Sequence, residues 1–391
     1  MEAKRWLSQV RLIETATARP AANRRWRIGL DGEERIARLE PIEPGSAAAG
    51  EDWQGDWLSP RGVDLQINGG LGLAFPELSD ADQPQLRELL ALLWRDGVEA
   101  IAPTLVTCGI GPLRQALAVL AGARANHRPG LCRLLGAHLE GPFLEASRRG
   151  AHPQEHLCPP SLAALNERLE GFSLGPEGDV ALVTLAPELP GAEPLITALR
   201  RQGVVVALGH SAANEEQAAA AFDAGVAMLT HTFNAMAGLH HRAPGPVAAA
   251  LRRADVALGL IADGVHVAPS MAVLLQRLAP SHTVLVSDAL APYGLGDGAH
   301  RWDERLLLVR DGSCRLEDGT LAGTTLPLLE GVSRLAAWGV PAEQAIAAAT
   351  LQPRRVLGDG RPAAQLLLGR PLADCLRWRD GERGLHWRPA A

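Results

Sequence analysis

The stretch Leu134-Leu-Gly-Ala-His-Leu-Glu-Gly-Pro-Phe143 decides the fold of this chain. An apolar run ends abruptly in an imidazole and a carboxylate, those of His138 and Glu140, and then in Gly-Pro. A buried parallel strand that ends at a catalytic rim has this pattern. A glutamate that closes such a strand is costly to bury unless it is paired or binds a metal ion. The stretch therefore predicts an α/β fold with an ionisable group at the carboxyl end of a core strand.

Two later apolar runs, Val204–His210 and Ala227–His231, end in the same way in a histidine. Glu140, His210 and His231 together offer one oxygen and two nitrogens, a ligand set that suits a catalytic zinc ion with an open fourth position. Each of these residues alone is more often structural. The prediction of a metal site therefore depends on three metal-binding residue types that close three strands of one sheet.

Apolar strands alternate with helical stretches from Ser59 onwards, and Asn214 is placed to cap one of the helices. The strand candidates are Val63–Asn68, Ala100–Thr107, Leu134–Glu140, Val180–Glu188, Val204–His210, Ala227–Asn234, Val256–His266 and Thr283–Asp288. Strand–helix alternation repeated eight times predicts a (β/α)8 TIM-like barrel. The active site of such a barrel lies at the carboxyl ends of its strands.

Short strand patterns with turn residues flank the barrel at both ends of the chain. Within residues 1–57, Asp31-Gly32 is a strong hairpin signal, and residues 361–391 have similar patterns around Asp380-Gly381. We predict that these two segments form one small β-sandwich lobe, and that residues 58–360 form the barrel. A further hairpin is predicted within residues 300–322, and this hairpin could join the small lobe.

Composition limits the classes of function and the compartment. A net charge of −6 argues against general binding to nucleic acid or to an anionic membrane. The five cysteines are odd in number and have no C-x-x-C spacing, which favours a reducing cytoplasm over a disulfide framework. The N-terminus lacks the apolar core of a signal peptide, and no apolar run approaches the roughly 18 residues of a membrane span. Lys4 is the only lysine, so no lysine of the barrel can act as a base or metal bridge.

Several other polar residues stand at predicted strand ends or beyond the barrel rim. Asp288 is either a buried aspartate held by backbone N–H groups or the base that takes a proton from metal-activated water. His266 could hold a substrate oxygen. Gln66 and Asn68 are weak metal ligands, so hydrogen-bonded strand ends are the favoured interpretation. The run His240-His-Arg242 is either a solvated loop or an anion clamp, since arginine matches phosphate geometry.

At these residues the chain resembles the amidohydrolase superfamily, and within it the N-acetylglucosamine-6-phosphate deacetylase family. The matching motifs span about residues 58 to 360 and occur in the order of that family. They are Val63-Asp-Leu-Gln-Ile-Asn-Gly69, His138-Leu-Glu-Gly-Pro-Phe143, Gly150-Ala-His152, Gly209-His-Ser211, Thr230-His-Thr-Phe-Asn-Ala-Met236, Asp263-Gly-Val-His266, Ser287-Asp288 and Leu321-Ala-Gly-Thr-Thr325.

The resemblance implies an enzyme that hydrolyses the acetamide of N-acetylglucosamine 6-phosphate to glucosamine 6-phosphate and acetate. It implies that Glu140, His210 and His231 bind one divalent metal ion per chain, zinc, and that Asp288 is the general acid/base. Substrate contacts are implied for Ala151, His152, Asn234, Ala235, His241, Arg242 and His266. A homodimer is also implied, in which His241 and Arg242 face the neighbouring active site.

One departure from the superfamily pattern bears on the metal count. Most amidohydrolases carry His-x-His on the first strand, where this chain has Gln66 and Asn68. This pair resembles the single-metal branch of the deacetylases and marks a vestigial second metal position. Two alternatives stay open: a deacetylase of an isomeric substrate such as N-acetylgalactosamine 6-phosphate, and a sugar-phosphate-binding homologue that has lost catalysis.

Overall fold

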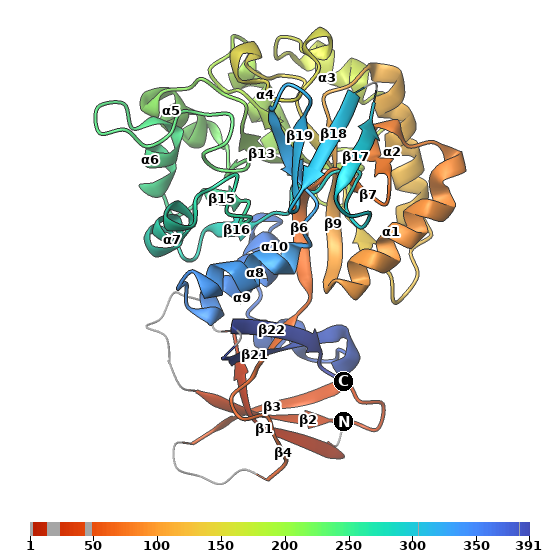
Figure 1. Ribbon diagram of the computed structural model, residues 1–391, viewed down its shortest axis with the longest axis vertical. Coiled ribbons are helices and arrows are strands. Elements are labelled where there is room, and N and C mark those ends of the chain that lie inside the picture. Colours follow the sequence, from red (N-terminus) through yellow and green to blue (C-terminus); the bar gives the residue numbers. More distant parts are fainter. Residues whose placement is uncertain (1–2, 14–23, 44–48, 304, 383) are drawn as a thin grey trace.

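The computed structural model describes residues 3–13, 24–43, 49–303, 305–382 and 384–391. It consists of a large α/β lobe and a small β lobe, and both termini lie in the small lobe (Figure 1). The chain passes from one lobe to the other through two consecutive strands, β5 (Trp57–Pro60) and β6 (Gly62–Ile67). The site predicted from the sequence belongs to the large lobe.

Eight parallel strands form a barrel and follow one another in chain order. They are β6, β9 (Val98–Val106), β11 (Ala137–Glu140), β12 (Val180–Leu185), β13 (Val205–Leu208), β14 (Met228–Leu229), β15 (Ala257–Leu260) and β16 (Thr283–Leu285). Between the last strand and the first, the Asp288 N–H donates to the Gln66 carbonyl at 2.9 Å, and the Asn68 N–H donates to the Ala289 carbonyl at 2.7 Å. These bonds join the two ends of the sheet, and the predicted (β/α)8 barrel is confirmed.

Helices surround the barrel and cover its outer face (Figure 1). The predicted cap at Asn214 is present, since its side chain accepts the Gln217 N–H at 2.8 Å. The helices are α1 (Gln83–Arg95), α2 (Ile110–Ala125), α3 (Leu162–Arg168), α4 (Ala192–Arg201), α5 (Glu215–Ala224), α6 (Gly245–Leu251), α7 (Pro269–Leu278), α8 (Leu328–Ala337), α9 (Ala342–Thr350) and α10 (Gln352–Val356). A further helix, α11 (Ala363–Leu367), packs in the small lobe through Leu367. Short elements in the loops are β7 (Gly69–Gly70), β8 (Leu73–Ala74), β10 (Arg133–Leu134), η1 (Phe75–Glu77), η2 (Asp80–Asp82), η3 (Ala146–Arg148), η4 (Gln154–His156) and η5 (Leu372–Asp374).

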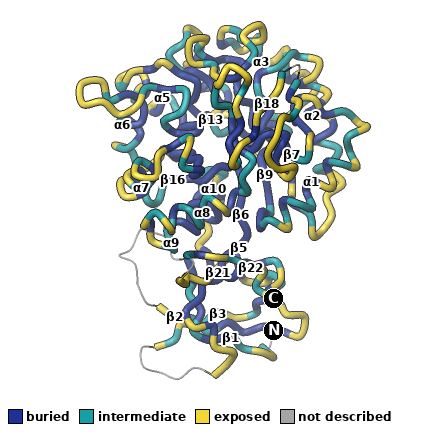
Figure 2. The backbone as a smooth tube through the Cα atoms, viewed as in Figure 1, coloured by how far each residue is buried: buried dark blue, intermediate teal, exposed yellow. Residues whose placement is uncertain are grey.

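Apolar side chains fill the barrel and the layer between its strands and helices. Small and branched residues such as Ala100, Ala181 and Val284 make up a cluster inside the barrel. A larger cluster lies between the strands and the helices, and the strands are accordingly the most buried part of the lobe (Figure 2). Within the described part of the chain, no helix combines the length and the apolar character needed to cross a lipid bilayer.

Several strands end earlier than the sequence predicts. The predicted strand Ala227–Asn234 is only Met228–Leu229, because the backbone turns at His231, where φ is 27°. The predicted strand Val256–His266 is only Ala257–Leu260. Beyond it, the Asp263 side chain accepts two backbone N–H groups and closes a turn. Apolar character therefore continues past the point at which strand pairing stops.

The hairpin predicted within residues 300–322 belongs to a separate antiparallel sheet of four strands. Its strands are β17 (Gly298–Trp302), β18 (Arg305–Arg310), β19 (Ser313–Leu316) and β20 (Leu321–Thr324). The last strand is hydrogen-bonded to the chain just after the barrel: the Leu290 N–H donates to the Thr324 carbonyl at 2.9 Å, and the Thr324 N–H donates to the Asp288 carbonyl at 3.0 Å. The expectation that this hairpin could join the small lobe is therefore wrong.

The small lobe contains strands from both ends of the chain, as predicted. They are β1 (Arg5–Leu12), β2 (Arg25–Leu30), β3 (Ile36–Ile42), β4 (Glu51–Asp52), β5, β21 (Cys375–Gly381) and β22 (Gly384–Pro389). They make one continuous mixed sheet in which β21 pairs with β5. The hairpin signal at Asp31-Gly32 falls between β2 and β3. Residues 1–2, 14–23 and 44–48 of the predicted segment 1–57 lie outside the described residues.

Candidate active site

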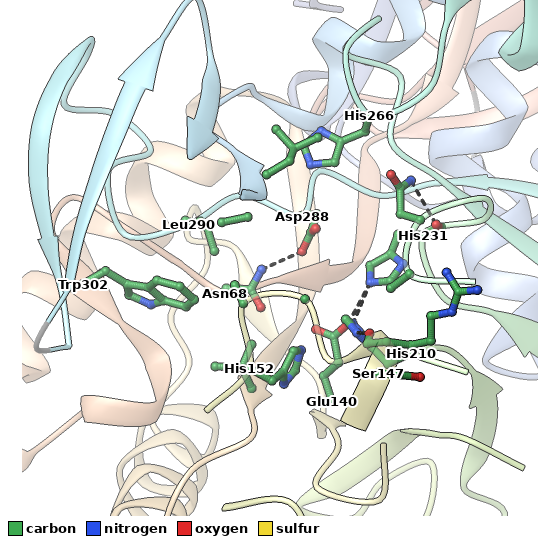
Figure 3. Close-up of a pocket in the computed structure, with 18 residues that line it drawn as sticks. Asn68, Glu140, Ser147, His152, His210, His231, His266, Asp288, Leu290 and Trp302 are labelled. Carbon is green, nitrogen blue, oxygen red and sulfur yellow. Dashed lines mark hydrogen bonds and ion pairs between the residues drawn. The ribbon is translucent and has the colours of Figure 1, made fainter. Parts of the chain in front are cut away.

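A cavity of about 350 Å³ lies at the carboxyl ends of the barrel strands, beside the sheet β17–β20. Most of the side chains predicted for the site line this cavity (Figure 3). They are Asn68, Glu140, Ala151, His152, His210, His231, Asn234, Ala235, His266 and Asp288. These positions meet because the carboxyl ends of parallel strands share one face of the barrel.

Glu140, His210 and His231 bring three ligand atoms close to one another. Oε1 of Glu140 lies 3.1 Å from Nε2 of each histidine, and the two Nε2 atoms are 3.0 Å apart. All three side chains are buried. Four ligands at about 2.0–2.1 Å from a tetrahedral ion lie at similar distances from one another. The spacing of this triangle therefore fits a single metal ion.

A hydrogen bond to His210 indicates which of its ring nitrogens can bind a cation. Its Nδ1–H donates to the Arg148 carbonyl at 2.9 Å, so in the neutral ring Nε2 carries a lone pair. Such a bond on the outer nitrogen is typical of histidines that bind metals. Lone-pair atoms that converge with a carboxylate oxygen repel one another unless a cation lies between them. The donor set is thus able to hold a metal ion.

His152 lies beside this triangle. A ring nitrogen of His152 is within 4.8 Å of the ligand atoms of Glu140 and His210, and its ring centroid is 4.4 Å from that of His210. The Thr107 N–H donates to His152 Nδ1 at 3.3 Å. Burial lowers the pKa of His152 to about 3, so the ring is neutral at pH 7. By spacing alone, Glu140, His152 and His210 could also hold a metal ion. With Nδ1 accepting the Thr107 N–H, however, Nε2 of His152 carries the proton and is a hydrogen-bond donor.

Besides Ala235, where φ is 52°, the backbone is left-handed at two of the triangle residues and at Asp288. The φ angles are 49° at His210, 27° at His231 and 47° at Asp288. Residues other than glycine rarely adopt this region, at a cost of about 1–3 kcal/mol each. Such strain gathers at functional sites, where the rest of the fold maintains it. Here each of the three residues stands just beyond the end of a barrel strand and lines the cavity.

Asp288 is the second carboxylate of the site, and amides hold it in place. Nδ2 of Asn68 donates to its Oδ1 at 2.7 Å, and Nε2 of Gln66 donates to the same atom at 3.3 Å. Gln66 also donates to Oε1 of Glu140 at 3.2 Å. The hydrogen-bonded strand end that the sequence favoured for Gln66 and Asn68 is therefore present. Gln66 lies behind the cavity wall rather than in it.

The two carboxyl groups have opposite pKa shifts. Burial, and secondly the charge of Glu140, raises the pKa of Asp288 to about 8. Burial would also raise the pKa of Glu140, but the ring nitrogens of His210 and His231 that approach its Oε1 outweigh burial when they carry protons, and they hold that pKa well below its usual range. A cation between the same atoms would act in the same direction. Glu140 thus stays ionised while Asp288 can carry a proton near neutral pH. A pair separated in this way is suited to general acid–base chemistry.

His266 is held from the far side of the cavity. Its Nδ1 lies 2.7 Å from Oδ2 of Asp263, and the other oxygen of Asp263 accepts the N–H groups of Val265 and His266. The carboxylate fixes the ring orientation and keeps a proton on Nδ1. Asp263 is thus more than a turn residue.

His138, from the stretch that decides the fold, lies one layer below the cavity. Its ring is 3.1 Å from the Thr104 hydroxyl and 2.7 Å from the Thr184 hydroxyl, and Thr184 in turn is 2.7 Å from the Thr230 hydroxyl. Burial lowers the pKa of His138 to about 4, so the ring is neutral. His138 therefore links neighbouring strands beneath Glu140 and does not reach the cavity.

Besides Gln66, two predicted residues lie outside the cavity of their own chain, and several residues that line it were not predicted from the sequence. His241 and Arg242 are exposed on the loop before α6 and do not line it. Ser147 and Arg148 do line it, as do Leu290 and Trp302 among others. The basic pair Arg148-Arg149, just before the Gly150-Ala-His152 motif, was a signal in the sequence for Arg148. No local signal in the sequence pointed to Trp302.

Curated relatives match most of the chain, although no family model matches it. The chain is 37% identical over 328 residues to N-acetylgalactosamine-6-phosphate deacetylase of Escherichia coli O157:H7, a match that covers 83% of this chain and 84% of the relative. It is 36% identical over 329 residues to N-acetylglucosamine-6-phosphate deacetylase of Mus musculus, with 81% of this chain and 78% of the relative covered. Sequence similarity thus covers about four fifths of this chain.

Solved structures agree with the fold over nearly the full chain. N-acetyl-D-glucosamine-6-phosphate deacetylase of Mycobacterium smegmatis, a mutant in complex with N-acetyl-D-glucosamine-6-phosphate, superimposes with a TM-score of 0.78 at 28% identity and covers 98% of this chain and 97% of that one. N-acetylglucosamine-6-phosphate deacetylase of Thermotoga maritima gives a TM-score of 0.77 at 28% identity, with 95% and 94% covered. The small lobe is therefore shared as well as the barrel.

Proposed function

The chain belongs to the N-acetylglucosamine-6-phosphate deacetylase family of the amidohydrolase superfamily, and from this premise we propose that it hydrolyses the acetamide of N-acetylglucosamine 6-phosphate to glucosamine 6-phosphate and acetate. The observation that carries the proposal is the triangle of Glu140, His210 and His231 in the same cavity as Asp288. Metal-dependent amide hydrolysis needs these two parts, a polarising cation site and a carboxyl group that exchanges protons.

We propose one divalent metal ion per chain, zinc, held by Glu140 Oε1 and by Nε2 of His210 and His231. Zinc accepts this mixture of oxygen and nitrogen ligands and leaves a position open. When bound, such an ion polarises a carbonyl group and lowers the pKa of water toward about 7. The amides of Gln66 and Asn68 support a single ion. Both donate N–H groups to carboxylate oxygens, and amides are weak metal ligands, so this pair does not favour a second cation.

In the proposed reaction, Asp288 accepts a proton from the attacking water as the new C–O bond forms. The same carboxyl group then donates the proton to the sugar nitrogen as the C–N bond breaks, so that acetate and the amine are released. His152 presents Nε2–H and is suited to donate to the carbonyl oxygen as negative charge develops on it. His266, oriented by Asp263, is suited to hold a sugar hydroxyl group.

For the phosphate we propose two sources of contacts. Arg148, Asn234 and the backbone of Ala235 line the cavity of the same chain. His241 and Arg242 lie outside it, so we propose a homodimer in which these two residues reach the neighbouring active site. An exposed arginine whose side chain has no carboxylate partner among the described residues supports this role. Arginine also matches phosphate geometry in a bidentate manner.

We propose that the protein works in the cytoplasm. The five cysteines are unpaired, as is usual in a reducing compartment. Three of them are buried, and burial raises the pKa of the Cys314 and Cys375 thiols to about 12. Such thiols are structural rather than reactive. We also propose that residues 58–360 form the catalytic barrel, and that residues 1–57 and 361–391 form its supporting lobe.

A second candidate substrate is N-acetylgalactosamine 6-phosphate, because the relative of 37% identity from Escherichia coli O157:H7 is named for that epimer. The experiment is a comparison of kcat/KM for the two epimers, with elemental analysis of the same sample. We expect the gluco substrate to be preferred. A preference for the galacto substrate would reassign the activity. Absence of turnover with both substrates, in protein that holds its metal ion, would favour a sugar-phosphate-binding role.

A further inference from the structure

The cavity is polar on one side of the metal-binding triangle and apolar on the other. Figure 3 shows Ser147, His210 and His231 on one side of Glu140 and Asp288, and Leu290 and Trp302 on the opposite side. The apolar side is completed by residues such as Leu321 and Ala322 from β20. Among the lining residues that the structure describes, Glu140, Asp288, Arg148 and the histidines are the only ones with an ionisable side chain, and the apolar side adds none.

This division has a chemical consequence, given the proposed function. A carbonyl carbon placed between the triangle and Asp288 carries two substituents, the sugar nitrogen and the acyl chain, which point in different directions. The sugar phosphate fits the polar side. The acyl chain is then directed toward the apolar side, where burial of each methylene group is favourable.

The indole of Trp302 is held firmly in this apolar wall. The Arg305 guanidinium lies over the indole with Cζ 4.5 Å from its centroid. That guanidinium also donates to the Ala151 carbonyl at 2.7 Å and forms an ion pair with Asp303 at 2.5 Å. Trp302 packs with Leu290 and Ala151 in one buried apolar cluster. These contacts hold the indole in its position in the apolar wall.

The part of the wall that comes from β20 lies close to Asp288. β20 pairs with the chain segment from Asp288 to Leu290 through two backbone hydrogen bonds. A Cβ atom at Gly323 would lie 2.6 Å from the Asp288 carbonyl oxygen and 3.0 Å from Leu290. Only glycine permits this close approach, so β20 lies directly against the segment that carries the proposed acid/base.

We propose that Trp302, with Leu290 and Leu321, forms the end wall of an acyl pocket and sets the longest N-acyl group that the enzyme hydrolyses. The proposal rests on the proposed function and deepens it. The chemistry is unchanged for longer acyl groups: water supplies the new C–O bond, the C–N bond breaks, and the amine takes the proton. Only the space beyond the carbonyl carbon limits the reaction.

The test compares kcat/KM for the N-acetyl, N-propionyl and N-butyryl derivatives of glucosamine 6-phosphate. For the unaltered protein we expect a loss of about 10–200-fold for each added methylene group. In Trp302→Leu we expect the ratio of N-butyryl to N-acetyl kcat/KM to rise at least about tenfold. Leu308→Ala is the matched control, because Leu308 is exposed on the neighbouring strand β18 and does not line the cavity.

An unchanged acyl ratio in Trp302→Leu, with the metal ion retained, would overturn the proposal. A rise in KM of equal size for all three substrates would also overturn it, because the indole would then bind the sugar. Should Trp302→Leu fail to fold, the half-buried Leu321→Ala tests the same wall, and an unchanged ratio there would count equally against it. Failure of the proposed function itself would be seen separately, as absence of N-acetyl turnover in the unaltered protein.

Discussion

Replacement of Asp288 by asparagine tests the proposed acid–base step most directly. The change keeps the shape of the side chain and an oxygen that can accept the N–H of Asn68, which lies 2.7 Å from Oδ1. It removes the ability to take and return a proton. General acid–base catalysis contributes about 10²–10⁴-fold, equivalent to about 2.7–5.4 kcal/mol of activation free energy. We therefore expect kcat to fall by at least this range while the metal content is unchanged.

The pH dependence adds a second measurement to the same experiment. Burial raises the pKa of Asp288 to about 8, and a divalent cation held by the adjacent triangle would attract the carboxylate and lower that value. Activity requires the ionised form, so kcat/KM should rise with pH along an acid limb centred below pH 8. In Asp288→Asn this limb should disappear, because the titrating group is gone.

Steady-state kinetics from pH 5 to pH 9, with elemental analysis, provide the assay. Asp64→Asn is the matched control: this buried aspartate accepts the Ser287 N–H at 3.2 Å but does not line the cavity. The acid limb should persist in this variant and move toward lower pH, because the Asp64 charge is one of the causes that raise the pKa of Asp288. Near-normal kcat in Asp288→Asn, or an acid limb that persists, would refute the assignment. The base would then have to be sought in another carboxylate, such as Glu188 or Asp263.

Three further predictions concern the metal ion, the phosphate and stability. Glu140→Gln should lose most of a metal content that is one ion per chain in the unaltered protein; two ions per chain at full activity would contradict the single-ion proposal. Arg242→Ala removes a charge-assisted hydrogen bond of roughly 1.5–3 kcal/mol, so kcat/KM should fall about 10–100-fold or more for the 6-phosphate but hardly for N-acetylglucosamine. Equal losses of kcat/KM on the two substrates would show that Arg242 is structural. If the arginine acts across a dimer, subunit exchange between Arg242→Ala and Glu140→Gln chains should partly restore activity. Burial raises the pKa of Asp64 to about 7 from 3.8, so the folded protein holds a proton that the unfolded chain releases, and folding stability falls as pH rises from about 4 to 7. Asp64→Asn should remove the part of this fall that comes from Asp64, while the part that comes from Asp288 remains, because the pKa of Asp288 is also raised. Above pH 7 the variant should be more stable than the unaltered protein by at most about 4 kcal/mol. A denaturation series in which both proteins keep the same pH dependence would contradict this.

The barrel could be predicted because its signal is local and repeated. Most of the predicted core strands are apolar runs of the length that a buried parallel strand needs, and each predicted strand ends at a polar residue. The triangle of Glu140, His210 and His231 followed from the same pattern, since residues that close parallel strands must share one face. The strand ends were less predictable. Asp263 stops its strand by accepting two backbone N–H groups, and an apolar sequence such as Ile261-Ala262 does not reveal that turn.

The sheet β17–β20 shows where local reasoning stops. A hairpin in this segment was predictable from alternation and turn residues, but its partner was not, because any exposed strand edge offers the same N–H and C=O groups. Only the folded chain shows that β20 pairs with residues 288–290 rather than with the small lobe. That choice brings Trp302 to the cavity, although no motif surrounds it.

The sequence alone determined the class of fold, the order of the strands and the identity of the polar residues that end them, because hydrophobic periodicity and strand-end chemistry are properties of short segments. The tertiary structure alone decided distances and environments: the 3.0–3.1 Å triangle, the opposite pKa shifts of Glu140 and Asp288, and the position of Arg242 outside its own cavity. Burial and Coulomb interactions depend on what surrounds a group in space, and those neighbours come from strands and loops that are far apart in the chain.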